Sequence, residues 1–238
     1  MPNFHNQRVF GRVVKISFTA FIILVNAVLL WRVFFSANIP NGLRALNANE
    51  HSLAAYEQYG EDITLRYQNT YSTTYGKGNV GYFSTAECTF LPQANQVQVV
   101  VRYNNSTLRS LARDYEMDEI PKKALEWFDF TLVRATDRTP EDPTDNNKPD
   151  VLTFERIAPT SSGREETALY TYYRLVFDNV TVAPDTDGIF LDVYYLGDLN
   201  YDQPAYGTLC LYDCRKEWMT RTLTRADRKA FDNAQAAN

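Results

Sequence analysis

Histidine is the scarcest residue of this 238-residue chain: it occurs only twice, as His5 and His51. The chain beyond residue 51 therefore cannot build a Ser-His-Asp triad, a Cys-His pair or a histidine-rich zinc site from its own residues. Glycine is also sparse, with 10 residues, and the sequence has no GxGxxG, Walker or HExxH motif. We therefore expect a non-catalytic protein.

Acidic residues are absent from the first 40 positions, which hold four basic residues. The rest of the chain carries the other 20 basic residues and all 29 acidic ones, a net charge of −9. Because an acidic surface repels phosphate, we expect no nucleic-acid partner. The chain combines a short basic, apolar leader with a long acidic body.

The leader contains a long apolar run, from residue 13 to residue 35. No charged residue lies between positions 16 and 31, and a helix of this length spans the hydrocarbon core of a bilayer. A cleaved signal peptide also begins with basic residues and an apolar run. However, the bulky Phe35 stands where a signal peptidase requires a small residue. We predict an uncleaved signal-anchor helix in the lipid bilayer, with a cleaved signal peptide as the alternative.

The charges beside this run predict its orientation. Three basic residues precede it and no acid offsets them: Arg8, Arg12 and Lys15. Because positive charge is retained on the cytoplasmic side, we expect the N-terminus in the cytoplasm and the body outside the membrane.

The composition after the leader predicts a stalk and one β domain. Residues 36–42 are polar and turn-rich, and the apolar positions up to residue 60 are sparse. The predicted organisation is a cytoplasmic tail (1–12), a transmembrane helix (13–35), a stalk (36–60), an extracytoplasmic β domain (61–223) and a C-terminal helix and tail (224–238).

Short β-branched and aromatic runs dominate the body and predict an all-β fold. They number about eight, with the spacing typical of an immunoglobulin-like or jelly-roll-like β-sandwich. Helical spacing occurs at 106–115, at 121–127 and after a capping box at Thr224–Asp227, and the proline-rich segment 137–150 predicts a long loop. The expected strands lie at 63–67, 80–90, 96–103, 128–133, 151–157, 168–178, 189–195 and 208–212.

Three cysteines lie in the body: Cys88, Cys210 and Cys214. Outside the cytoplasm a disulfide is permitted, and a bond between Cys88 and Cys210 would link two predicted strands. A turn at Asp213 would bring Cys210 and Cys214 together instead. In the third interpretation all three are free thiols that fill apolar space.

Acidic spacing gives one weak metal motif. Asp198, Asn200 and Asp202 place oxygen ligands at alternate positions, as a calcium loop of the EF-hand type does. The glycine and glutamate that such a loop needs are replaced by Gln203 and Leu209, so turns capped by their own side chains explain the pattern better. Calcium is the one cofactor that the sequence leaves open.

A basic run near the C-terminus includes Arg221, Arg225, Arg228 and Lys229. It could contact anionic lipid or an anionic envelope polymer. A solvated helix face that balances the acidic body explains it more simply.

Together these features predict a single-pass membrane protein that displays a β domain outside the cell membrane. We expect it to be a non-catalytic interaction or structural module of the cell envelope, with another envelope protein or an anionic polymer as its partner. Two alternatives remain: a carboxylate-based hydrolase of extracellular glycans, which needs two facing carboxylates, and a calcium-dependent adhesion domain.

Overall fold

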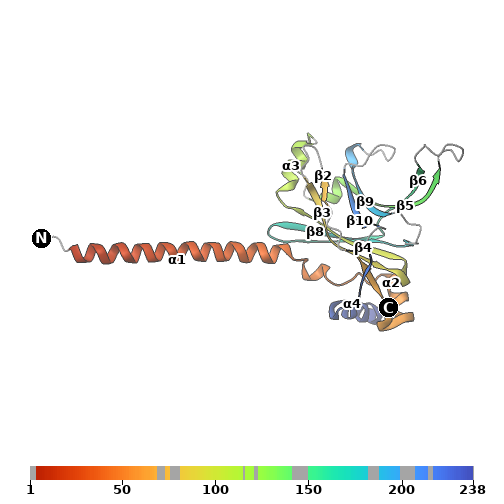
Figure 1. Ribbon diagram of the computed structural model, residues 1–238, viewed down its shortest axis with the longest axis horizontal. Helices are drawn as coiled ribbons and strands as arrows, with labels where there is room; N and C mark the ends of the chain where they lie inside the picture. Colours follow the sequence, from red (N-terminus) through yellow and green to blue (C-terminus); the bar gives the residue numbers. More distant parts are fainter. Residues whose placement is uncertain are drawn as a thin grey trace. The chain divides into compact units, whose positions relative to one another are not determined.

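The computed structural model describes residues 4–68, 73–75, 81–114, 116–120, 123–140, 150–181, 188–198, 207–213 and 217–237 (Figure 1). The chain forms two compact units, residues 1–38 and residues 39–238. The first is helical, and the second, the body, is mostly β-sheet.

One helix, α1 (Phe4–Ala37), makes up the first unit. Its segment Val13–Trp31 is 19 residues long, has a mean hydropathy of 2.3 and is 0 % buried. Asn26 donates its side-chain amide to the Ile22 carbonyl at 2.8 Å, so this polar group is satisfied within the helix. The helix is therefore long and apolar enough to span a membrane.

The larger sheet of the body is antiparallel and, among the described residues, has seven strands. Its strand order is β11, β1, β3, β4, β8, β7, and β2 also pairs with β3. Asn95 closes the connection between β3 and β4 in the left-handed conformation, with φ 47°, which asparagine tolerates better than most residues. The strands are β1 (Leu65–Tyr67), β2 (Thr73–Tyr75), β3 (Gly81–Leu91), β4 (Gln96–Asn104), β7 (Ser161–Glu166), β8 (Tyr170–Phe177) and β11 (Met219–Arg221).

The second sheet is also antiparallel, with four described strands in the order β10, β9, β5, β6. Apolar and polar residues alternate along β5, which places Phe128, Phe130 and Leu132 on one face. These strands are β5 (Phe128–Pro140), β6 (Asp150–Ile157), β9 (Gly188–Tyr195) and β10 (Gly207–Asp213).

One hydrophobic core takes residues from both sheets. Val97, Val99 and Val101 of β4 share it with Phe130 of β5 and Leu191 of β9. Because side chains alternate between the faces of a strand, Gln96 and Gln98 must point to the opposite face of the larger sheet.

That opposite face is covered by helices. α2 (Glu50–Tyr59) and α4 (Arg225–Ala237) lie side by side there (Figure 1). Leu53 and Phe231 from these helices share a second core with Leu91 of β3. The reciprocal hydrogen bonds between Thr224 and Asp227 show that the predicted capping box begins α4.

Residues 39–60 are part of the body, although their composition suggested a stalk. Leu43, Leu46 and Leu53 are all buried, and the 3-10 helix η1 (Asn41–Leu43) packs against β7. A few apolar residues were enough to pack this segment on the body, because each one enters a hydrophobic core that also contains residues of the larger sheet.

Other elements differ from the sequence expectations at their ends. β2, β7 and β11 were not expected, and β5 continues to Pro140, into the segment expected to be a loop. Residues 141–149 of that expected loop lie outside the described residues. The remaining described helical segments are α3 (Thr107–Asp114), η2 (Gly60–Asp62), η3 (Pro92–Ala94), η4 (Ala124–Glu126) and η5 (Leu196–Asp198).

Candidate functional site

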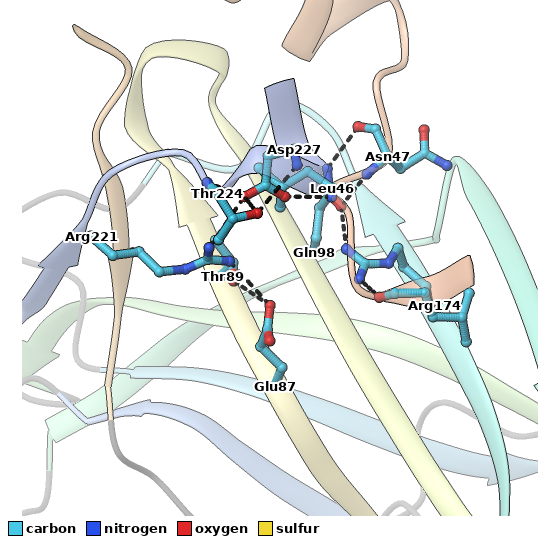
Figure 2. Close-up of polar contacts among 10 residues, drawn as sticks. Leu46, Asn47, Glu87, Thr89, Gln98, Arg174, Arg221, Thr224 and Asp227 are labelled. Atoms are coloured by element: carbon cyan, nitrogen blue, oxygen red, sulfur yellow. Dashed lines mark hydrogen bonds and ion pairs between the residues drawn. The ribbon is translucent and has the colours of Figure 1, made fainter. Parts of the chain in front are cut away.

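A buried polar cluster on the helix-covered face of the larger sheet holds the segment that follows α1 (Figure 2). We call residues 43–49 the stem segment. The clamp consists of five side chains that bind it directly or through one another: Gln96, Gln98, Arg174, Asp178 and Asp227. Each is at most 4 % exposed, which is unusual for such polar residues.

Asp227 of α4 binds the middle of the stem segment. Its carboxylate accepts the backbone N–H of Leu46 at 2.8 Å and both the N–H and the hydroxyl of Thr224, at 2.8 and 2.7 Å. Arg221 of β11 lies 3.3 Å from the same carboxylate. A buried carboxylate needs such donors, and here it joins the stem segment to the C-terminal helix.

Arg174 and Gln98 bind the two sides of the stem segment. Arg174 donates Nη2 to the Leu43 carbonyl and Nη1 to Gln98 Oε1 at 2.9 Å. Gln98 accepts the Asn47 N–H at 2.8 Å and donates Nε2 to the Asn47 carbonyl at 2.9 Å. One glutamine therefore pairs with both backbone groups of Asn47, as a neighbouring strand would.

The Arg174 guanidinium is a strongly desolvated charge. Burial lowers its pKa, while the carboxylates of Glu87 and Asp227 act in the opposite direction. Its Nε is buried without a hydrogen-bond partner. The nearby carboxylates stabilise the positive charge of Arg174 in this buried site.

Asp178, at the end of β8, holds the start of α2. It accepts Asn49 Nδ2 at 2.9 Å, Gln96 Nε2 at 2.7 Å and the Thr160 hydroxyl at 2.6 Å. Burial raises its pKa, but the hydrogen bonds from Gln96, Thr160 and Asn49 outweigh burial, so its pKa lies below 3.8. Asn49 also caps α2 by accepting the Ser52 N–H.

Some basic residues of the run near the C-terminus form ion pairs within the body. Arg221 lies 3.3 Å from both Glu87 and Asp227, and Arg228 lies 2.8 Å from Glu61. Figure 2 shows Arg221 between the two carboxylates. Arg225 and Lys229 are exposed, and the ion pairs of the described residues include neither of them.

The clamp binds protein segments together. Its two carboxylates accept several hydrogen bonds each from the chain itself, and their donors come from residues far apart in sequence. The arrangement therefore fixes the stem segment and α4 on the sheet.

The predicted disulfide pair consists of free thiols in this structure. Cys88 lies in β3 and Cys210 in β10, and both are partly buried by solvent exposure. Burial, then the charges of Glu87 and Cys210, raise the pKa of Cys88 to about 12. A disulfide between Cys88 and Cys210 stays a prediction, and Cys214 lies outside the described residues.

The calcium motif falls mostly outside the described residues. Asp198 ends η5, whereas Asn200 and Asp202 are not described. Among the described residues, no group of three or more His, Cys, Asp or Glu side chains could hold a metal ion. The orientation residues Arg8, Arg12 and Lys15 lie in α1.

Two carboxylates, Asp129 and Asp192, are diagonal neighbours on the outer face of the four-stranded sheet. Asp129 pairs with Tyr194 across β5 and β9, and Asp192 lies two residues from Tyr194, so both carboxylates share one face. Asp129 accepts the Thr131 hydroxyl and Asp192 the Thr208 hydroxyl, each at 2.7 Å. Two carboxylates on one face are what a glycan hydrolase needs.

The residues of the clamp were missed in the sequence, apart from Asp227 in its capping box. Gln96 and Gln98 alternate with valines, a pattern typical of a strand with one face in water. Arg174 interrupts an apolar strand, and a charged residue in such a strand was the sequence feature that could have indicated the clamp.

Comparison with known proteins gives no family for this chain: no family model, no curated protein and no solved structure matches it.

Proposed function

We propose that this chain is a single-pass protein of the cell membrane, with its N-terminus in the cytoplasm and a β-sandwich domain outside. In this proposal the domain is a non-catalytic interaction or structural module of the cell envelope. The observation that carries the proposal is the apolar segment Val13–Trp31, which is 19 residues long and 0 % buried. Exposed apolar surface marks a contact with membrane or protein, and the length of this segment fits a bilayer.

The connection between the two units supports a structural role. α1 ends at Ala37, and the body begins at Ile39. The clamp then fixes residues 43–49 with hydrogen bonds from three side chains that are almost wholly buried, Gln98, Arg174 and Asp227. Because the body begins so soon after α1, such an anchor would display the domain without a long tether.

Protease accessibility tests the topology. Intact cells or spheroplasts that express the full chain with an N-terminal tag are treated with protease, and inside-out vesicles are treated in parallel. We expect the body to be digested in cells while the tagged tail survives. Digestion of the body only in inside-out vesicles reverses the orientation, and release of the whole chain by alkaline carbonate removes the membrane anchor from the proposal.

A glycan hydrolase is the second candidate, because the strand register makes Asp129 and Asp192 diagonal neighbours on one face. It predicts that the purified full chain releases reducing sugar from an envelope polysaccharide, and that Asp129→Asn and Asp192→Asn each abolish the release. Equal release by the wild type and both variants would exclude this pair as the catalytic one.

A further inference from the structure

Asp178 of the clamp joins a hydroxyl to a side-chain amide. Its Oδ2 accepts the Thr160 hydroxyl at 2.6 Å and Nδ2 of Asn49 at 2.9 Å. Thr160 lies just before β7, and Asn49 is the last residue of the stem segment. A hydroxyl nucleophile, a base and an amide carbon are therefore neighbours, and this is the set of groups that acyl transfer needs.

The Asp178 carboxylate is placed to accept the proton of that hydroxyl. The Thr160 hydroxyl lies 2.6 Å from Asp178 and 3.2 Å from the Val176 carbonyl, so the carboxylate is the nearer acceptor. Asp178 is 4 % exposed, and its Oδ1 also accepts Gln96 Nε2 at 2.7 Å. Because its hydrogen bonds outweigh burial and lower its pKa, the carboxylate is ionised at neutral pH.

Hydrogen-bond donors point at the carbonyl oxygen of the Asn49 side chain. Its Oδ1 accepts Gln96 Nε2 at 2.7 Å and the backbone N–H of Ser52 at 3.2 Å. Gln96 and Ser52 are both 0 % exposed, and hydrogen bonds are electrostatically stronger in such a buried environment. Attack on the amide carbon places negative charge on this oxygen, and donors already aimed at the oxygen stabilise that charge.

We propose that Thr160 and Asn49 react to form an ester, which links the stem segment covalently to the segment that begins β7. Oγ1 of Thr160 attacks Cγ of Asn49 while Asp178 takes the hydroxyl proton, and negative charge passes to Oδ1 of Asn49. The Cγ–Nδ2 bond then breaks, Asp178 gives the proton to Nδ2, and ammonia leaves. The reaction uses no oxidant or cofactor, and it regenerates the Asp178 carboxylate.

The reaction takes place once in each molecule, so it needs far less rate acceleration than an enzyme that turns over. It follows folding, because only the folded body holds residues 49, 160 and 178 together. The ester keeps the stem segment attached to the sheet when the hydrogen bonds of the clamp open. The inference does not depend on the membrane topology, because all these residues lie within the body.

Mass spectrometry of the full chain, purified folded in detergent micelles, tests the ester. We expect the intact mass to be lower than the sequence requires by one ammonia, about 17 Da. Trypsin should then release residues 45–66 and 157–164 as one joined product. Hydroxylamine, which cleaves esters, should separate the two peptides. The wild type alone decides the outcome, so the test does not depend on the folding of a variant.

Substitutions then assign the role of each group. Thr160→Val removes the nucleophile and should have the full mass, as should Asp178→Asn, which removes the base, whereas Thr160→Ser should still lose ammonia. Thr208→Val is the matched control, because the Thr208 hydroxyl also donates to a carboxylate, that of Asp192 at 2.7 Å, and this variant should lose ammonia as the wild type does. A wild type of full mass, or one in which Asn49 is hydrolysed to aspartate, would overturn the proposal.

Discussion

Replacing Asp227 by alanine should release the stem segment and destabilise the body. The carboxylate is 0 % exposed and accepts two backbone N–H groups, those of Leu46 and Thr224. Each buried donor left without an acceptor costs about 1–3 kcal/mol, and Arg221 loses one of its two carboxylates. We therefore expect the free energy of unfolding to fall by about 3–5 kcal/mol, the range for a broken buried charge contact.

Urea unfolding of the full chain in micelles, followed by circular dichroism of the β signal, measures this loss. Asp118→Ala removes an exposed carboxylate and is the control, with an expected change within about 0.5 kcal/mol. Trypsin gives a local readout, because Arg44 is exposed beside the clamped residues. Cleavage after Arg44 should be much faster in Asp227→Ala than in the control. If both variants unfold at the same urea concentration and are cleaved at the same rate, Asp227 does not hold the stem segment.

Three further results are expected. Hydrogen bonds outweigh burial and keep the pKa of Asp178 below 3.8. As the pH falls below about 4, the unfolded chain therefore binds the proton first, and the free energy of unfolding decreases. Asp178→Asn should flatten this pH dependence, and an unchanged curve would contradict the prediction. Arg174→Met should cost about 1–3 kcal/mol in urea unfolding, because the Leu43 carbonyl loses its donor; no loss would show that this contact is dispensable. Burial raises the pKa of Cys88 to about 12, so at pH 8 iodoacetamide should label it far more slowly in the folded chain than in urea. Equal labelling rates would refute this prediction. A disulfide with Cys210 would instead lower the mass of the unreduced protein by two hydrogens.

The strands with alternating apolar residues were predictable from the sequence. Leu65, Phe130 and Val99 each lie in a run whose period of two matches a half-covered sheet, and each is buried in the structure. β7 was not predictable, because an edge strand of sequence SSGREE has no apolar face to produce that period. β2 and β11 have only three residues each, too few to show any period.

The clamp could not be predicted, because the sequence of β4 does not show what covers its polar face. Alternation of Gln96 and Gln98 with valines indicates one apolar face but gives no information on whether water or protein covers the polar one. Both glutamines are buried, and their partners lie in the stem segment and on β8. The polar face was covered by a segment whose own composition suggested a solvated stalk.

The sequence distances within the clamp bear on how the domain completes its fold. Leu46 and Asp227 are 181 positions apart, and Leu43 and Arg174 are 131 apart, so no local window contains either pair. Contacts of such separation form only after the intervening chain has been ordered, because closing so long a loop costs entropy that few contacts repay early. We therefore expect the stem segment to dock only after β8 and α4 are in place.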